Sequence, residues 1–153
     1  MKIALITLSN EGEKVTAELK KTFQEAVVFL HERITPEAEG ERFSKVAELT
    51  ARIFGEYEGL VYVAPCGAVV RAIAGRVGSK LTDPAVVVLD VGGRHAISLL
   101  SGHEGGANDL AVAVGNAIGA EPVITTTTEA VRNIIVGVGC RKGKAILCCI
   151  NKS

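Results

Sequence analysis

The sequence predicts an α/β fold: a three-layer α/β/α arrangement in which helices cover both faces of a mainly parallel, mixed sheet of about five or six strands. Apolar runs of strand length alternate with stretches in which apolar residues recur every three or four positions. Between residues 85 and 100 two apolar runs are joined by Gly92 and Gly93 without a helix, which predicts a hairpin. The 153 residues, 48% hydrophobic and 22% charged, suffice for one such domain.

Each of the first three predicted strands is followed by a predicted helix. Residues 2–9 predict a buried strand, and the next helix has the inward residues Val15, Leu19 and Phe23. Residues 25–31 predict a second strand, followed after a polar loop by an apolar stripe of Phe43, Val46, Thr50, Ile53 and Tyr57. Residues 59–65 predict a third, whose helix has the inward residues Val70, Ile73, Ala74 and Val77. This alternation is typical of a parallel sheet.

The remaining elements are the hairpin, one helix and a short strand. The hairpin strands are expected at 85–91 and 95–100, and the helix at 107–119 presents Leu110, Val114, Ala117 and Ile118 on one face. Residues 121–128 close the domain as a short strand and a polar loop. A strand-like run at 133–143 begins a further strand–helix unit whose helix is not recognisable.

The composition excludes several classes of function. The 17 basic residues balance the 17 acidic ones, and with no Trp, two Tyr and four Phe the chain has no base-stacking platform, so we expect no nucleic-acid partner. The apolar runs are too short for a signal peptide or a membrane span, which predicts a cytoplasmic protein. Its four cysteines have no CxxC or zinc spacing, so we expect neither a disulfide nor a structural metal.

Three loops are candidates for chemistry, because open α/β sheets bind ligands beyond the carboxyl ends of their parallel strands. They are SNEG after the first strand, APCGA after the third and SGHEGG before the 107–119 helix. His103 can join Cys66 at that edge only if 85–91 is the antiparallel strand and the stretch GSKLTDP crosses the sheet, a reach of roughly 23 Å. We expect this arrangement, which also places Thr82 and Asp83 at that edge.

For the SGHEGG loop, a functional and a structural interpretation remain open. The glycines suit a tight turn that a ligand can approach, and His103 titrates near neutral pH in its unperturbed state. Alternatively, Ser101 or Glu104 caps the following helix and His103 is only solvated.

Three other side chains have the same two interpretations. Cys66 is either a nucleophile at a helix start or a small filler at a strand end. Asp83 is a catalytic carboxylate or part of an Asp-Pro turn, and Arg71 binds a carboxylate or is a solvated helical arginine. GVGCRKG is glycine-rich but lacks the spacing of either nucleotide fingerprint.

Several longer strings identify a family. The strings are VYVAPCGAVVRAIA, SKLTDPAVVVLD, ISLLSGHEGGANDLA, GAEPVITTTTEA and VGVGCRKG. Together they resemble the CbiG family of anaerobic cobalamin biosynthesis, the cobalt-precorrin-5A hydrolases. The first four cover the family's N-terminal domain, residues 1–128, and VGVGCRKG is similar to the opening of its C-terminal domain. By this resemblance, 129–153 is the truncated start of that second domain.

The resemblance implies a hydrolase that opens the δ-lactone of cobalt-precorrin-5A and releases acetaldehyde to give cobalt-precorrin-5B. For this reaction our hypothesis assigns His103 as the general base or acid, oriented by Glu104 or Asp83, and the Gly105 and Gly106 N–H groups as donors to an oxyanion or a substrate carboxylate. Arg71 and Lys80 would neutralise peripheral carboxylates. The full set of expected substrate-binding residues is Cys66, Gly67, Arg71, Lys80, Thr82, Ser101, Gly102, Gly105, Gly106 and Asn108.

Cobalt arrives inside the substrate, so no protein-bound cofactor or metal is expected. A macrocycle is wide for one small domain, which favours a homodimer or a separate C-terminal-domain partner, with no membrane partner. Two alternatives remain: a tetrapyrrole-binding module without activity, and a flavodoxin-like nucleotide-binding domain. The second lacks a complete phosphate loop.

Overall fold

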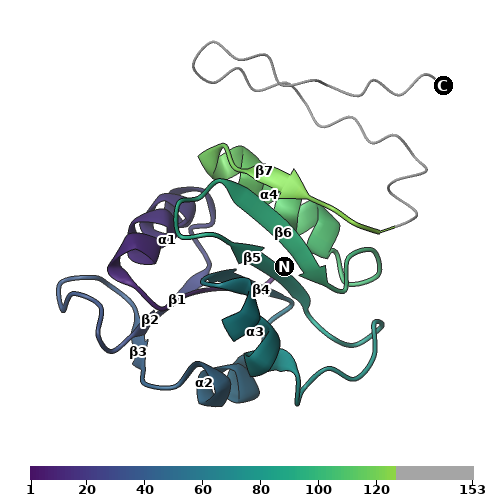
Figure 1. The fold of residues 1–153 in the computed structure, drawn as a ribbon, viewed down its shortest axis with the longest axis horizontal. Coiled ribbons are helices and arrows are strands. Elements are labelled where there is room, and N and C mark those ends of the chain that lie inside the picture. Colours follow the sequence, from purple (N-terminus) through teal and green to yellow (C-terminus); the bar gives the residue numbers. More distant parts are fainter. Residues whose placement is uncertain (127–153) are drawn as a thin grey trace, which may run out of the picture.

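The structure is a computed structural model that describes residues 1–126. Its elements follow the order shown in Figure 1. The predicted strand at 133–143, the segment 129–153 and the end of the predicted domain 1–128 lie outside the described residues. The fold predictions that can be compared with the structure are therefore those up to Thr126.

Seven strands form a single sheet in the described part of the chain. Their order across the sheet is β3-β2-β1-β4-β5-β6-β7. The strands are β1 (Ile3–Thr7), β2 (Val27–His31), β3 (Glu41–Phe43), β4 (Gly59–Val63), β5 (Ala85–Leu89), β6 (His95–Leu100) and β7 (Glu121–Val123). The predicted fold class is confirmed. The expected five or six strands become seven because β3, a short edge strand, lies within the predicted polar loop and its apolar stripe.

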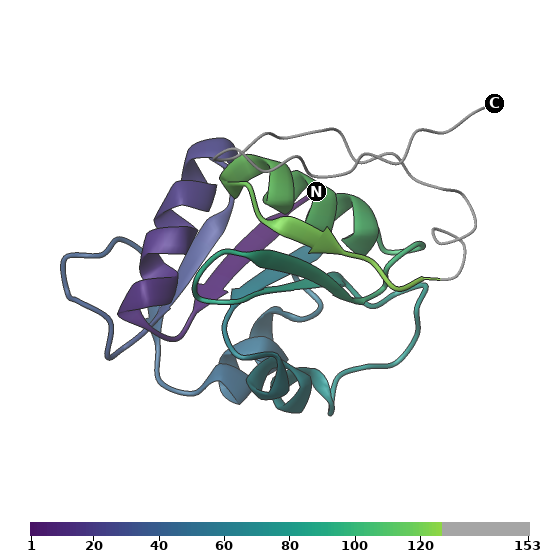
Figure 2. The same cartoon turned by 45° about the horizontal axis from the view of Figure 1, so that its top comes forward.

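Within residues 1–126, four helices cover the two faces of the sheet. They are α1 (Asn10–Thr22), α2 (Val46–Ile53), α3 (Cys66–Ile73) and α4 (Ala107–Ile118). One buried cluster joins one face of the sheet to α2 and α3, and the other joins the opposite face to α1 and α4. Figure 2 shows these pairs of helices on opposite sides of the strands. This is the predicted three-layer arrangement.

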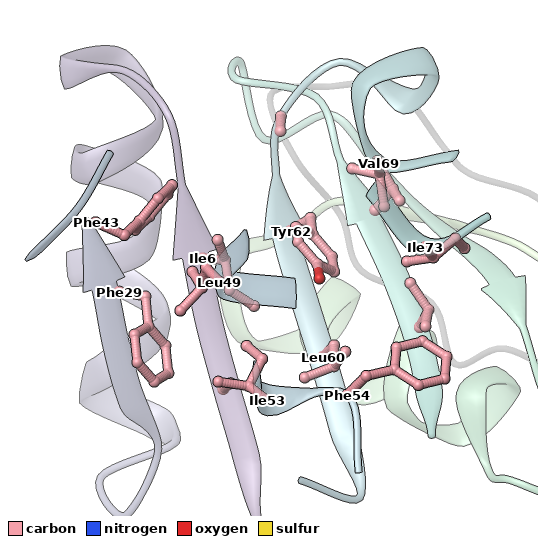
Figure 3. Close-up of a cluster of buried hydrophobic side chains, with 14 residues drawn as sticks. Ile6, Phe29, Phe43, Leu49, Ile53, Phe54, Leu60, Tyr62, Val69 and Ile73 are labelled. Carbon is pink, nitrogen blue, oxygen red and sulfur yellow. The ribbon is translucent and has the colours of Figure 1, made fainter. Parts of the chain in front are cut away.

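The cluster beneath α2 and α3 contains a buried polar pair. Figure 3 shows Tyr62 of β4 among the apolar side chains of this cluster. Its hydroxyl oxygen lies 2.8 Å from Thr50 Oγ1 of α2, and both residues are fully buried. Burial raises the pKa of Tyr62 to about 12, with the Thr50 hydrogen bond acting in the opposite sense. The phenol therefore stays neutral and joins α2 to the sheet.

The expected antiparallel direction of the strand at 85–91 is wrong. β5 is parallel to β4 with Tyr62 opposite Val88, whereas β6 is antiparallel to β5 with Ile97 opposite Val88. All five residues of β5 are buried, as in a central parallel strand covered on both faces, while β6 is mostly half-buried. The chain returns from β4 to β5 through α3, so residues 78–84 need not cross the sheet.

The predicted inward face of α3 needs correction, whereas that of α4 is confirmed. On α3, Val69 and Ile73 are buried, whereas Val70 is 46% exposed and Val77 beyond the helix is 47% exposed. Val69 therefore takes the inward position that was predicted for Val70. On α4, Leu110 and Val114 are buried as expected, and Ala117 and Ile118 pack against the same cluster.

A single carboxylate organises the turn between β5 and β6. Asp90 Oδ1 accepts hydrogen bonds from the backbone N–H groups of Arg94 and His95 at 2.9 and 2.8 Å, and Oδ2 accepts one from Gly92 at 3.1 Å. Partial burial acts to raise the pKa of Asp90, but the hydrogen bonds from His95 and Arg94 outweigh it and lower that pKa. The ionised carboxylate therefore stabilises the reversal of chain direction.

Replacing Asp90 with Asn is expected to lower the free energy of unfolding at pH 7 by about 1–2 kcal/mol, because the backbone donors lose an ionised acceptor. The lowered pKa means that this contribution is present above the unfolded-state value and is lost as pH falls through the folded-state value. Urea unfolding at pH 7 and at acid pH measures both effects. The difference between the two proteins should shrink in acid, and a constant difference would contradict this account.

Candidate functional site

The strand directions divide the predicted site residues between opposite edges of the sheet. Cys66 and Gly67 follow β4 at the carboxyl edge of the parallel strands. The loop of Ser101–Gly106, here named the His103 loop, follows antiparallel β6 and lies at the amino edge. Asp83 precedes β5 and lies at the same edge as the His103 loop. The expected single cleft containing Cys66, Asp83 and His103 is therefore not formed.

Backbone groups of the His103 loop satisfy the start of α4. The Ala107 N–H donates to the Ser101 carbonyl at 3.1 Å, and the Asn108 N–H donates to the Gly102 carbonyl at 2.9 Å. Gly106 is the N-cap residue, with φ 82°, and no side chain caps the helix. The interpretation that Ser101 or Glu104 caps this helix is therefore wrong. His103 and Glu104 are both exposed, and neither side chain is the N-cap of α4.

The loop packs closely against the segment before β5. A Cβ on Gly105 would lie 2.5 Å from Ser101 Cβ and 3.3 Å from the Asp83 carbonyl oxygen. Asp83 is thus next to the loop through its backbone. Its carboxylate accepts hydrogen bonds from the Gly78 N–H at 3.0 and 3.2 Å. The structure supports the turn interpretation of Asp83, and Glu104 is the carboxylate closer to His103 along the chain.

Two predicted substrate-binding residues of this region are buried. Asn108 is 4% exposed, and its side-chain amide bonds with Ser98 and Thr126. Ser101 is 9% exposed, has a left-handed backbone with φ 57°, and its buried hydroxyl has no hydrogen-bond partner among the described residues. In this conformation both side chains point into the protein interior and not toward solvent, and Gly102 has no room for a side chain. They shape the loop from beneath.

The remaining predicted binding residues lie on α3 and the segment after it. Arg71, Lys80 and Thr82 are exposed, and the Arg71 guanidinium donates a hydrogen bond to the Gly67 carbonyl at 3.1 Å. No acidic residue occurs between Gly59 and Thr82. Neither Arg71 nor Lys80 forms an ion pair with another described residue. This surface is therefore cationic, and it also exposes Val70, Val77 and Leu81.

A second candidate location is the carboxyl edge between β1 and β4. These strands are neighbours, but β1 continues into α1 on one face and β4 into α3 on the other, which is the usual ligand position in open α/β sheets. The Ser9 hydroxyl caps α1 by accepting from the Gly12 N–H at 3.2 Å. Cys66 is exposed at the start of α3, which no side chain caps. The sequence indicated both loops but not this strand order.

A shallow groove at the β3 edge was not predicted. It has a volume of about 460 Å³ and is lined by Glu32, Arg42, Phe43, Ser44, Lys45, Glu48, Leu49 and Arg52. Its cations are occupied: Lys45 pairs with Glu48 at 2.7 Å, and Arg52 pairs with Glu41 at 2.5 Å. The hydrogen bond and charge of Glu48 raise the pKa of Lys45. Arg42 donates to backbone carbonyls between Ile34 and Ala38, so each of the three cations in the groove already has a partner.

Two features are absent from residues 1–126. No group of three or more His, Cys, Asp and Glu side chains is arranged to hold a metal ion there. No helix in this part of the chain has the length and apolar character needed to span a membrane.

Comparison with known proteins identifies the family. The family model described as cobalamin synthesis G N-terminal, CbiG_N, matches residues 48–129, more than half of the chain. The chain belongs to this CbiG N-terminal family. The match includes α3, the hairpin, the His103 loop and α4. The predicted resemblance to CbiG is thereby confirmed.

Relatives of this CbiG domain include cobalt-precorrin-5A hydrolases. That of Priestia megaterium is 39% identical over 138 residues, covering 87% of this chain and 37% of the relative. That of Salmonella typhimurium strain LT2 is 47% identical over 83 residues, covering 54% of this chain and 24% of the relative. The chain thus spans less than half the length of these CbiG relatives.

A solved structure agrees with the fold. The crystal structure of a cobalamin biosynthesis protein G homologue from Sulfolobus solfataricus matches with a TM-score of 0.64 and 23% sequence identity. The match covers 90% of this chain and 41% of that chain. It supports the α/β architecture of the CbiG domain.

Proposed function

We propose that this chain acts in anaerobic cobalamin biosynthesis by hydrolysing the δ-lactone of cobalt-precorrin-5A, with release of acetaldehyde to give cobalt-precorrin-5B. The observation that carries the proposal is the His103 loop within the CbiG family match. This loop exposes His103 and Glu104, while backbone carbonyls satisfy the helix that follows. The loop thus holds a histidine and a carboxylate at the protein surface, where a substrate can reach them.

In the proposed reaction His103 accepts a proton from the water that attacks the lactone carbonyl. Addition of this water gives a tetrahedral intermediate, whose collapse breaks the acyl carbon–oxygen bond while the same imidazole returns the proton to the leaving oxygen. The alcohol that results then loses its hydroxyl proton as the bond between its carbon and the macrocycle breaks. Acetaldehyde leaves, and the macrocycle keeps the electron pair of that bond and takes up a proton. Glu104 orients the imidazole. The N–H groups of Gly105 and Gly106 have no hydrogen-bond partner among the described residues, which supports their proposed role as donors to the oxyanion.

The substrate is proposed to lie against the cationic surface after α3. Its macrocycle has an apolar face and a rim of acetate and propionate carboxylates. Arg71 and Lys80 would pair with the carboxylates, and Leu81 would contact the apolar face. Leu81 is 72% exposed, and Asp83 two residues later meets the His103 loop at Gly105. This continuity supports a substrate that extends from α3 to His103.

This arrangement favours the amino edge over the carboxyl edge as the reaction site. Cys66 and Gly67, predicted to bind substrate, are at the carboxyl edge, where α3 begins. We propose that they take no part in the reaction and that Asn108, Ser101 and Gly102 support the loop. Cobalt is carried by the substrate. A homodimer or a partner equivalent to the rest of the longer relatives would enclose the macrocycle.

The test uses the purified 153-residue chain and cobalt-precorrin-5A. Acetaldehyde is measured enzymatically while the corrinoid absorption spectrum is followed in the same reaction. We expect acetaldehyde to appear in proportion to the spectral change. Spectral titration showing binding without acetaldehyde would replace the hydrolase with the binding-module alternative. Neither binding nor release, in a protein with an intact melting transition, would overturn the proposal for this chain.

A further inference from the structure

Asn108 connects three separate segments around the His103 loop. Its side-chain Oδ1 accepts a hydrogen bond from Ser98 Oγ of β6 at 2.8 Å. Its Nδ2 donates to Thr126 Oγ1, beyond β7, at 2.9 Å. Its backbone N–H donates to the Gly102 carbonyl of the His103 loop at 2.9 Å. One buried residue in the first turn of α4 thus joins β6, the loop and the chain after β7.

Steric contact reinforces this connection at Gly102. A Cβ added to Gly102 would lie 2.8 Å from Asn108 Oδ1 and 2.8 Å from Thr126 Cγ2. The His103 loop therefore meets the Asn108 amide and the Thr126 side chain at one point. Thr126 cannot move away without opening space beneath Gly102 and removing the acceptor of Asn108 Nδ2.

The helix alone gives no reason for asparagine at this position. Asn has a lower helix propensity than Ala, and a buried amide is costly unless its polar atoms are hydrogen-bonded. At 4% exposure, Asn108 depends on Ser98 and Thr126 for those bonds. The value of the amide therefore lies in the segments that it joins.

We propose that Asn108 is a positioning residue through which the chain at Thr126 controls the His103 loop. With Thr126 in place, the amide is satisfied and the loop holds the geometry described above. With Thr126 withdrawn, the amide loses a partner and the loop loosens at Gly102. Only the link to turnover rests on the proposed function.

The experiment compares Thr126→Val with Thr125→Val in the 153-residue chain. Valine keeps the shape of threonine but removes the hydroxyl that accepts from Asn108. Thr125 is the exposed neighbour, so its substitution is a matched control. NMR hydrogen exchange is measured at the Ala107 and Asn108 N–H groups, which donate to Ser101 and Gly102 of the loop. We expect about five- to tenfold faster exchange in Thr126→Val and no change in Thr125→Val.

The scope of the change distinguishes positioning from general stability. The proposal predicts faster exchange at Ala107 and Asn108 only, and recovery in Thr126→Ser, which restores an acceptor oxygen. Unchanged exchange in Thr126→Val, or an equal increase throughout the sheet, would overturn it.

Activity gives a separate readout. If the chain releases acetaldehyde, Thr126→Val should lower kcat several-fold with KM nearly unchanged, because the loop and not the α3 surface is disturbed; a change confined to KM would contradict the positioning role. If the chain releases none, the hydrolase proposal fails while the exchange result still decides the role of Asn108.

Discussion

Replacing His103 with Gln is expected to lower the rate of acetaldehyde release by about 10²–10⁴-fold, because the amide cannot accept and return a proton in the hydrolysis of the lactone. The exposed position of His103 on the loop means that the melting temperature should change little. Acetaldehyde release under saturating substrate gives the rate, and spectral titration of the same variant gives the affinity. Binding should be retained, since the proposed carboxylate contacts come from the α3 surface.

His95→Gln is the matched control for this experiment. His95 is also exposed, but it begins β6 at the carboxyl edge, beside Asp90 and away from the His103 loop. We expect this variant to turn over at close to the unsubstituted rate. Equal loss of rate in both variants would show a general effect of histidine removal, and full activity in His103→Gln would remove His103 from the mechanism.

Replacing Gly12 with Ala is expected to lower the free energy of unfolding by about 2–3 kcal/mol, through overpacking of the interior. Gly12 lies in the first turn of α1, where an added Cβ would overlap Thr7 Oγ1 and approach the Val63 carbonyl oxygen to 3.1 Å. Thr7 Oγ1 donates a hydrogen bond to that same carbonyl at 3.2 Å, so the methyl group would also disturb a buried bond. Urea unfolding measures the loss.

Gly55→Ala serves as the control for Gly12→Ala. An added Cβ on Gly55 has no atom within 4 Å, so this substitution should leave stability unchanged or raise it slightly by restricting the unfolded chain. If both variants lose the same stability, the loss reflects glycine replacement in general. A stable Gly12→Ala protein would show that α1 can move away from β1 and β4 at little cost.

The fold was predictable from the sequence because its periodic signals come from burial. The runs that became β1, β2 and β4 are apolar throughout or nearly so, and each precedes a helix with a clear apolar face. The edge strand β3 was missed because three residues, Glu41–Phe43, are too few to show a period. The predicted direction of β5 is wrong because it was chosen to bring His103 and Cys66 to one edge of the sheet. The run AVVVL itself is typical of a central parallel strand.

The candidate site was only partly predictable, for a different reason. The string SGHEGG identified the loop. However, the first N–H groups of α4 donate to the backbone carbonyls of Ser101 and Gly102, and hydrogen bonds between backbone groups cannot be recognised from the residue types in a sequence. The role of Asn108 depends on Ser98 and Thr126, which come together only when β6 and β7 flank α4. Pairings between distant segments of this kind follow from topology and cannot be deduced from local spacing.

The antiparallel turn at Asp90 also decides at which edge of the sheet the last described strand ends. Since β7 is parallel to β6, it runs against β1, and the polypeptide enters and exits the sheet at the same edge. Met1 lies against Gly106 at that edge, and Thr126 lies against Gly102. A protein fused after Thr126 would therefore begin next to the His103 loop, whereas Cys66 lies at the opposite edge of the sheet. In fusion designs, the length of the linker at this exit sets whether an added domain covers the His103 loop or leaves it open.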